Sequence, residues 1–390
     1  MPDSQRIEAR LQELWTLARG PGGGADRPAY SSAEAAAMQL VAGWAGEAGL
    51  EPGLDAFGNL WALPLGVERV FTAGSHVDTV PDGGRYDGAL GTVLGLELAL
   101  EREDAGILIC AAEEAPRFGA GTLGSRLLAG TLRSEDLAGM SDAEGVSAAD
   151  ALTGYLDALS DLPRVEPPLG RVRAHGEIHV AQRRALRELG VVTRVASPRR
   201  LEVVIDGQAG HSGEVSMEER RDALAAAASV VLAVESAARA EPPETVATVG
   251  RLSVSPGAIS VIPARVVMLL DLRGVDKSSL DRVEGEIRAF VEAIAADREV
   301  EAEVSLLRGG DPVSLDPELA RRALAAAQGF AIPVAETWSG AGHDAQHLAA
   351  LLPTLLVFVP LHGGESHTPE EGADMAEILA AARVVSAALS

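Results

Sequence analysis

Cysteine, lysine, asparagine and basic charge are scarce in this chain. Of the 390 residues, Cys110 is the only cysteine, Lys277 the only lysine and Asn59 the only asparagine. A single cysteine excludes an internal disulfide framework. The 33 Lys and Arg against 57 Asp and Glu give a net charge of −24, whereas binding to nucleic acid needs a basic surface. The composition therefore argues against a nucleic-acid partner.

Long apolar runs are absent as well. No stretch approaches the roughly 20 apolar residues that a membrane-spanning helix needs. Arg6, Glu8 and Arg10 interrupt the N-terminal segment where a secretory signal would carry its apolar core. Cys110 lies in an apolar segment with nothing to pair with, which is typical of a small buried hydrophobe. We expect no membrane contact and a cytoplasmic location.

The apolar pattern predicts two domains, since 390 residues exceed one ordinary core. Strands and helices alternate up to about residue 196, which favours an α/β domain with a mainly parallel sheet covered by helices. Residues 197–311 instead read strand-helix-strand-strand-helix-strand, the ferredoxin-like split βαβ order. We therefore expect a first domain of residues 1–196 and 312–390, interrupted by an α+β domain of residues 197–311. The helices expected outside the insertion include 5–18, 32–49, 143–168, 317–328 and 370–388.

Five residues stand in contexts that suit metal ligands: His76, Asp87, Glu114, His179 and His367. His76 follows an apolar run, and Asp78 two residues later would project to the same face of a strand. A carboxylate that orients a histidine is a recurrent feature of metal sites. Glycine beside Asp87 would let the backbone approach an ion closely.

Two acids, Glu113 and Glu114, close the apolar segment 106–112. Such a pair is costly at the end of a buried strand unless a cation lies nearby; one acid can bind metal while the other handles a proton. Each segment also has a plainer reading, because lone histidines often pack and paired acids often face solvent. Three of the eight histidines nevertheless fall beside carboxylates or Gly/Ser loops. This pattern favours a site for Zn, Mn or Co.

These motifs resemble those of the hydantoinase/carbamoylase group of di-metal amidohydrolases, and they occur along the chain in the same order as in that group. That group includes allantoate amidohydrolase, N-carbamoyl-L-amino acid hydrolase and beta-ureidopropionase, and it is related to aminoacylase and glutamate carboxypeptidase. The resemblance extends from about Asp55 to the C-terminus. Its matching stretches include 55–60, 74–80, 87–88, 112–118, 124–126, 177–182, 210–213, 217–224, 271–273, 339–345 and 366–367.

The resemblance implies a di-zinc-peptidase-like catalytic domain with two divalent ions per subunit, Zn or Mn, with Co or Ni also possible. Asp87 would bridge the ions, with His76 and His179 completing one site and Glu114 and His367 the other. The smaller domain would serve as a lid and form a homodimer. The expected substrate is a small molecule that carries a carboxylate.

The resemblance also implies roles for residues that bind no metal. Glu113 would be the general base, and Asp78 would orient His76. His211 would stabilise the developing oxyanion and Arg273 would grip the substrate carboxylate. The remaining substrate-binding candidates are Gln182, Ser260 and His343, the last of which would either contact substrate or brace its loop.

Three departures bear on the substrate. The chain has Ala115-Pro116 where the family usually has Gly-Ser, and Ala181-Gln182-Arg183 where it has Glu-Gln-Gly. Ser260 replaces an asparagine that contacts substrate in the family. The expected reaction is hydrolysis of the ureido or amide C–N bond of an N-carbamoyl amino acid or allantoate-like substrate. An N-acyl amino acid deacylase or peptidase of the same superfamily, and a non-catalytic dimeric descendant, stay open.

One motif suggests a different class of protein. Residues 119–124 satisfy the dinucleotide-binding Gly-x-Gly-x-x-Gly spacing after a strand. A lone match is a weak signal, and the acids Glu113 and Glu114 just before it would repel a pyrophosphate. No Gly-x-Ser-x-Gly sequence of a serine hydrolase is present. Metal-dependent hydrolysis is therefore the favoured prediction.

Overall fold

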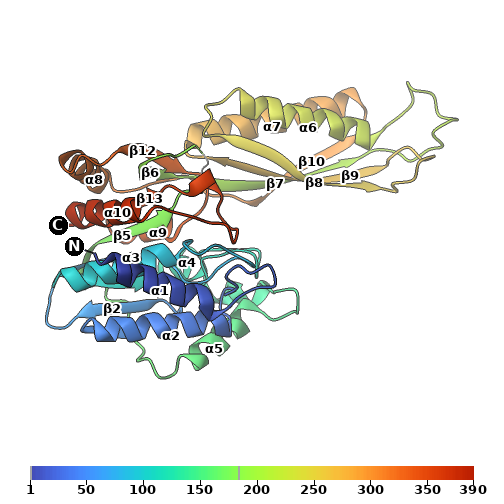
Figure 1. The fold of residues 1–390 in the computed structure, drawn as a ribbon. Coiled ribbons are helices and arrows are strands. Elements are labelled where there is room, and N and C mark those ends of the chain that lie inside the picture. The colour runs from blue at the N-terminus through green and yellow to red at the C-terminus, as the bar shows by residue number, and fades with distance from the viewer. Residues whose placement is uncertain (1, 183–184) are drawn as a thin grey trace. The chain divides into compact units, whose positions relative to one another are not determined.

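The computed structural model describes residues 2–182 and 185–390. Its contacts divide the chain into two compact units (Figure 1). Unit 1 comprises Met1–Thr193, Ser314–Trp338 and Gly342–Ser390, and unit 2 comprises Arg194–Val313 and Ser339–Ala341. The boundaries expected at 196/197 and 311/312 lie within three residues of the two main crossings between the units. The short return through Ser339–Ala341 had no signal in the sequence.

A nine-stranded sheet organises unit 1. Its order is β1-β2-β4-β3-β5-β13-β6-β11, with β12 paired to β6. The central strands β4, β3, β5 and β13 are parallel, whereas β1, β2 and β6 run antiparallel to their neighbours. The mixed α/β class with a parallel centre is as expected, and antiparallel strands flank that centre. The strands are β1 Leu50–Leu54, β2 Leu60–Pro64, β3 Val70–Gly74, β4 Ala105–Ile109, β5 Val172–Val180, β6 Leu189–Val195, β11 Val313–Ser314, β12 Val334–Ser339 and β13 Thr354–Val359.

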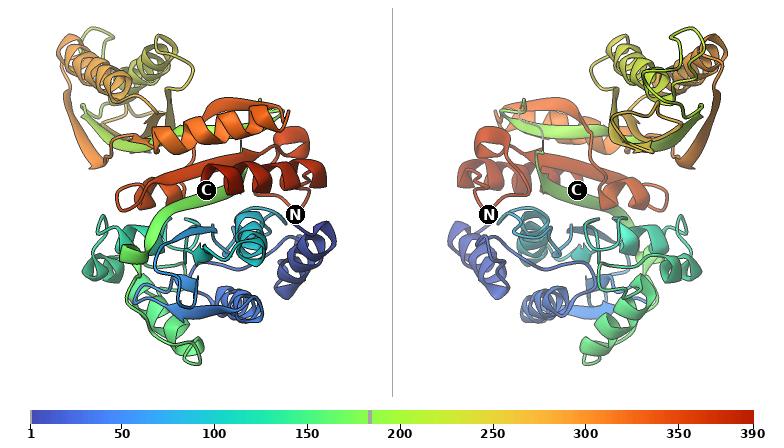
Figure 2. Two further views of the ribbon diagram at one scale, coloured as in Figure 1. Left: turned by 90° about the vertical axis from the view of Figure 1, so that its left-hand side faces the viewer. Right: turned by 90° about the vertical axis from the view of Figure 1, so that its right-hand side faces the viewer.

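Helices cover both faces of this sheet. Side chains along a strand alternate between its faces, and every residue of β4 is buried, so each face of that strand needs a covering layer. Along β4, Ile107 and Ile109 join the large core with α3 and α10. Leu108 and the adjoining Cys110 join a second cluster on the opposite face, where Leu348 of α9 packs. Figure 2 shows helices on both sides of the sheet. The helices of unit 1 are α1 Ser4–Leu17, α2 Ser32–Glu47, α3 Ala89–Glu101, α4 Leu123–Leu128, α5 Ala148–Ala158, α8 Pro317–Gly329, α9 Asp344–Leu348 and α10 Met375–Ala388, with 3-10 turns η1 Ser134–Gly139, η2 Leu169–Arg171 and η3 His362–Gly364.

Two expected helices are shorter than the sequence pattern suggested. The segment 143–168 forms a helix only over α5, because Pro163, Pro167 and Pro168 lack the amide donors that a continuing helix needs. The final helix begins at Met375 instead of 370. Glu371 lies in the preceding loop, where its side chain accepts hydrogen bonds from the amides of Tyr86, in another loop, and His367, in the same loop.

Unit 2 has the expected order of elements. Its strands form an antiparallel sheet in the order β10-β7-β9-β8. Helices α6 and α7 lie side by side on one face of this sheet (Figure 1). Alternate residues of β7, Leu201, Val203 and Ile205, are buried beneath them. The elements are β7 Ser197–Asp206, α6 Ala223–Arg239, β8 Val246–Ser255, β9 Arg265–Gly274, α7 Lys277–Asp297 and β10 Glu301–Arg308. In the described part of the chain, no helix combines the length and apolar character that crossing a bilayer requires.

Candidate metal centre

The five predicted ligands gather at the carboxyl ends of the parallel strands, within unit 1. His179 is the penultimate residue of β5, and His76 lies two residues beyond β3. Glu114 follows β4, and His367 lies in the loop after β13. Asp87 reaches them from the loop before α3. This edge of a parallel sheet is where α/β folds place ligands, because the loops there converge on one crevice.

Asp87 is the centre of the cluster. Its Oδ1 lies 3.2 Å from His179 Nε2 and 3.5 Å from His76 Nε2. Its Oδ2 lies 3.3 Å from His367 Nε2, which is 3.5 Å from Glu114 Oε1. The five side chains therefore form two groups of three, and Asp87 belongs to both.

Asp78 holds His76 and the paired acids together. Its Oδ1 lies 3.3 Å from His76 Nδ1 and accepts a hydrogen bond from the Glu113 amide at 3.1 Å, while its Oδ2 accepts one from the Glu114 amide at 2.8 Å. The Asp78 side chain is fully buried. Glu113 Oε2 lies 3.9 Å from His76 Nε2. The predicted base thus stands beside the ligand cluster.

The backbone around the site is tightly constrained. A Cβ on Gly88 would lie 2.4 Å from the His76 ring, so the loop that carries Asp87 can approach His76 only with glycine there. Ala112, just before the paired acids, has φ +54°, and its amide donates to the buried Glu34 at 2.8 Å. Strained backbone of this kind is held by its surroundings and is common at functional sites.

The electrostatics of the centre show how strongly its histidines and carboxylates interact. Burial lowers the pKa of His76, but the nearby carboxylates of Asp78 and Asp87 outweigh it and leave that pKa well above its usual value. A hydrogen bond to Asp87 raises the pKa of His367 to about 9. Burial raises the pKa of Glu114 to about 7 and that of Glu113 well above its usual range. Positive charge is therefore favoured within the cluster.

A divalent cation pair fits these residues. Asp87 Oδ1 is buried and accepts no hydrogen bond, which leaves a lone pair free for a ligand bond. Three imidazole nitrogens and two carboxylates form a borderline N/O donor set that suits Zn, Mn, Co or Ni. Gln182 Nε2 donates to Asp87 Oδ2 at 3.2 Å and lies 3.2 Å from His367 Nε2, so this predicted substrate residue borders the cluster.

His343 is buried beside the predicted metal ligands. It is fully buried, and its ring lies 4.6 Å from that of His179 and 5.3 Å from that of Phe358, measured between centroids. With Glu177 and His179 it forms a third group of close ligand-type atoms. Two roles were predicted for His343, contact with the substrate and support of its loop. Its burial favours support of the loop.

Three buried carboxylates around the site had no clear signal in the sequence. Glu177 accepts from Ser75 Oγ at 3.0 Å and from the Ala345 amide at 2.8 Å. Glu34 accepts from the amides of Tyr30 and Ala112. Glu371 accepts from the amide of Tyr86, in the loop before α3, and from the amide of His367, in its own loop. Only the i, i+2 spacing of Glu177 and His179 on one strand could have pointed to any of them.

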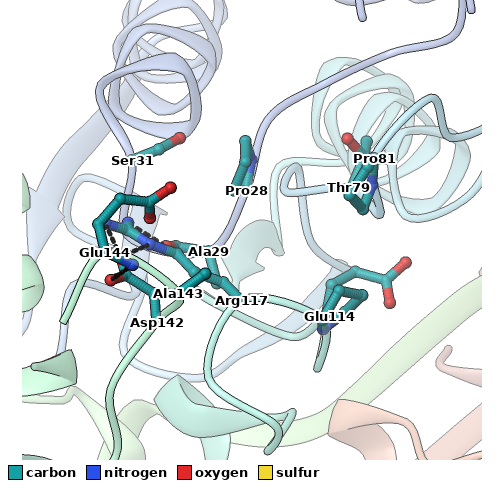
Figure 3. Close-up of a pocket in the computed structure, with 11 residues that line it drawn as sticks. Pro28, Ala29, Ser31, Thr79, Pro81, Glu114, Arg117, Asp142, Ala143 and Glu144 are labelled. Carbon is teal, nitrogen blue, oxygen red and sulfur yellow. Dashed lines mark hydrogen bonds and ion pairs between the residues drawn. The ribbon is translucent and has the colours of Figure 1, made fainter. Parts of the chain in front are cut away.

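Two cavities open beside the ligands. One, of about 580 Å³, is lined by Gln182, His367 and the segment 364–368. The other, of about 380 Å³, lies next to Glu114 (Figure 3). There Arg117 donates to Asp142 Oδ2 at 3.1 Å and to the Ala29 carbonyl at 2.7 Å. The other residues lining this second cavity are Pro28, Ser31, Thr79, Pro81, Pro116, Ala143 and Glu144.

Three predicted substrate residues belong to unit 2. His211 and Ser260 lie on adjacent segments, since the Ser212 amide donates to the Ser260 carbonyl at 3.0 Å. Arg273, on β9, donates to Asp271 at 2.9 Å and to the Gly340 carbonyl at 3.4 Å. Their roles stay predictions. Arg183, one of the departures noted in the sequence, is outside the described residues.

Residues 72–390 match Peptidase family M20/M25/M40. The chain belongs to this family. It is 36% identical over 386 residues to an N-carbamoyl-L-amino acid amidohydrolase of Geobacillus stearothermophilus, with 95% of this chain and 94% of that protein covered. It is 32% identical over 410 residues to a ureidoglycolate hydrolase of Arabidopsis thaliana, with 100% and 86% covered.

Solved structures agree with the sequence relatives. An amidase of the hydantoinase/carbamoylase family from Burkholderia multivorans superposes with a TM-score of 0.86 at 33% identity, covering 100% of this chain and 97% of that one. The resemblance to the hydantoinase/carbamoylase group is thereby confirmed. The predicted class, a hydrolase, agrees with the names of these relatives.

Proposed function

We propose that this protein is a metal-dependent amidohydrolase that cleaves the ureido or amide C–N bond of an N-carbamoyl amino acid or allantoate-like substrate. One observation carries the proposal: Asp87 is shared between a His76/His179 group and a Glu114/His367 group. Relatives named N-carbamoyl-L-amino acid amidohydrolase, ureidoglycolate hydrolase and allantoate amidohydrolase cover most of the chain.

The residues divide the chemistry between them. Two divalent ions held by the five ligands would lower the pKa of water and stabilise the charge that develops on the attacked carbonyl. Glu113 takes a proton from the attacking water and passes it to the leaving nitrogen, a role worth about 10²–10⁴-fold. Asp78 fixes His76 and both amides of the acid pair, so it keeps the base aligned with the ligands.

Unit 2 supplies the groups that recognise the substrate in this proposal. Arg273 grips the carboxylate, since a guanidinium can bind it with two parallel hydrogen bonds. His211 donates to the developing oxyanion, and Ser260 lies next to it in place of the family's asparagine. Unit 2 would act as a lid whose closure completes the site. Identical interdomain angles in crystals with and without a substrate analogue would contradict closure.

The cavity beside Glu114 is the proposed place for a substituent of the substrate. Its walls are rich in proline and alanine carbon, and its one arginine, Arg117, is already bound to Asp142 and a carbonyl. An anionic group would also meet Glu144 there. An uncharged apolar side chain therefore fits it best, which favours N-carbamoyl derivatives of hydrophobic amino acids.

A homodimer through unit 2 is part of the proposal. Strand β8 ends the four-stranded sheet, and most of its residues are exposed, including Val246 and Leu252. Leu232 of α6 and Phe290 of α7 are exposed on the neighbouring helices. An exposed edge strand is a template for pairing with another chain. Light scattering should give twice the chain mass, and Leu252→Glu should shift the measured mass towards that of the monomer.

A cytoplasmic location is also part of the proposal. The single cysteine, Cys110, is buried and free, which agrees with it.

Ammonia release tests the function. Protein reconstituted with Mn or Zn is incubated with N-carbamoyl amino acids, N-carbamoyl-β-alanine, allantoate and ureidoglycolate, with Glu113→Gln as control. Ammonia that depends on Glu113 supports ureido hydrolysis and names the substrate class. No ammonia from protein with two bound ions would favour an N-acyl amino acid deacylase or peptidase. No ammonia and no bound ions would favour a non-catalytic descendant.

A further inference from the structure

Two of the metal-ligand loops are joined by a single buried carboxylate outside the ligand set. Glu371 lies between η3 and α10, and only 7% of its surface is exposed. Its Oε2 accepts hydrogen bonds from the amides of Tyr86, at 3.0 Å, and Asp87, at 3.2 Å. Its Oε1 accepts from the His367 amide, at 3.1 Å, and from Ser366 Oγ, at 3.2 Å. One side chain thus holds the loop of Asp87 against the loop of His367.

The loop that carries His367 needs such support. His367 has φ +60°, in the left-handed region. A residue with a Cβ is disfavoured there, and such a conformation persists only where its surroundings enforce it. The His367 amide donates to Glu371, and Ser366 Oγ lies 2.9 Å from Asp87 Oδ2. These contacts fix the direction in which the His367 imidazole points.

Gly84 leaves the space that the Glu371 carboxylate occupies. A Cβ built on Gly84 would lie 1.8 Å from both Cδ and Oε2 of Glu371. The clash would involve the end of a side chain that is itself held by four hydrogen bonds. The loop before Asp87 is therefore shaped to admit this carboxylate.

The two halves of the ligand cluster depend on Glu371 unequally. His179 lies within β5, and His76 is oriented by Asp78, so neither needs Glu371 for its position. His367, in contrast, lies in a loop, and its amide is bound by Glu371. Asp87 is shared, but its Oδ1 also faces His76 and His179, which are positioned without Glu371.

We infer that Glu371 is a positioning residue that locks the Asp87 and His367 loops together and thereby sets the affinity of the ion on the Glu114/His367 side. This inference rests on the proposed two-ion centre. Glu371 binds no ion itself; it acts through the backbone of two ligands. Residues that orient ligands in this way typically change metal affinity about 10–100-fold when they are replaced.

Titration of metal-free protein with Co(II), followed by calorimetry and by the visible spectrum of the bound ion, tests the inference. Wild-type protein should bind two ions per chain. Glu371→Gln keeps the size of the side chain but turns an amide donor towards a side that an N–H group now occupies. We expect its first ion to bind as in wild type, and its second at least about tenfold more weakly, with an altered spectrum for that ion alone.

Glu370→Gln is the matched control, because it removes the same charge from the neighbouring exposed residue; both of its ions should bind as in wild type. Gly84→Ala displaces the Glu371 carboxylate without removing it, so this variant should also bind its second ion more weakly. It replaces Glu371→Gln as the test if that variant does not fold. Two wild-type affinities in Glu371→Gln, or equal weakening of both ions, would overturn the inference. Absence of ions from wild-type protein would instead overturn the proposed metal centre.

Discussion

The two units bury very different kinds of residue. Unit 1 buries many ionisable side chains. In its ligand cluster, histidine nitrogens lie within 3.5 Å of carboxylate oxygens, and no arginine or lysine is among the described contacts of these pairs. Unit 2 buries one ionisable side chain, Arg199, among its residues in the described ranges. That arginine is paired with Asp281 at 2.6 Å and Glu284 at 3.1 Å.

This difference is the one expected if unit 1 binds divalent ions and unit 2 does not. Burying an unpaired charge is costly, so buried carboxylates generally coordinate metals or find partners. The core of unit 2 needs no such partner, since alternating apolar residues of β7 and β9 pack beneath α6 and α7. Unit 1 should therefore depend on divalent cations for stability as well as for activity, and unit 2 should not.

Removal of the ions should have the largest effect. We expect a chelator to abolish turnover and Mn or Zn to restore it, because the ions would activate the attacking water. The chelator should also destabilise unit 1, because a ligand that binds only the folded state stabilises it, by about 2.7 kcal/mol at 100 times its Kd. Hydrogen exchange should rise around residues 76–87, 113–114 and 366–371. Exchange in β7, β9 and α7 should stay constant. Equal acceleration in both units would contradict the comparison.

Glu113→Gln should have the next largest effect, and it should be confined to chemistry. With the proton acceptor removed, kcat should fall by about 10²–10⁴-fold, while metal content stays as in wild type. Steady-state kinetics together with metal analysis measure both quantities. Glu103→Gln, an exposed glutamate of the same unit, is the control and should leave kcat unchanged. A wild-type kcat in Glu113→Gln would refute its role as base.

Arg273→Leu tests whether unit 2 contributes to binding. Loss of hydrogen bonds to a charged group costs about 1.5–3 kcal/mol, so KM should rise tenfold or more with a smaller change in kcat. Arg265→Leu lies on the same strand and removes an arginine paired with Asp206; its KM should match wild type. If KM were equal in all three proteins, the substrate carboxylate would be bound elsewhere.

Ala143→Trp should have the smallest effect and should change only selectivity. The new ring would fill the cavity beside Glu114, lowering kcat/KM for N-carbamoyl derivatives of large apolar amino acids by roughly threefold to tenfold relative to N-carbamoylglycine. Ala325→Trp, on the exposed face of α8, serves as control. An unchanged ratio between large and small substrates would place the substituent outside this cavity.

The sequence predicted the ligand cluster better than the residues that support it. His76, Asp87, Glu114, His179 and His367 each stand at a strand end or in a Gly/Ser loop, and a parallel sheet brings such ends together. The split βαβ order of unit 2 was equally readable, because its strands and helices keep clean periodicities.

The supporting carboxylates could not be predicted, for a physical reason. Glu34 and Glu371 act on backbone amides of residues that are distant in sequence. No local pattern marks such partners, since the contact exists only once the loops have folded. The left-handed conformation of His367 was hidden in the same way, because nothing in a Ser-His-Thr sequence requires it. The lengths of α5 and α10 likewise depended on prolines and on a loop carboxylate rather than on apolar periodicity.

A crystal structure of the Mn-loaded protein, with anomalous scattering recorded at the Mn edge, tests the central claim most directly. The account predicts two anomalous peaks per chain, both within bonding distance of Asp87, with His76 and His179 on one and Glu114 and His367 on the other. A single peak, or two peaks that do not share Asp87, would contradict it.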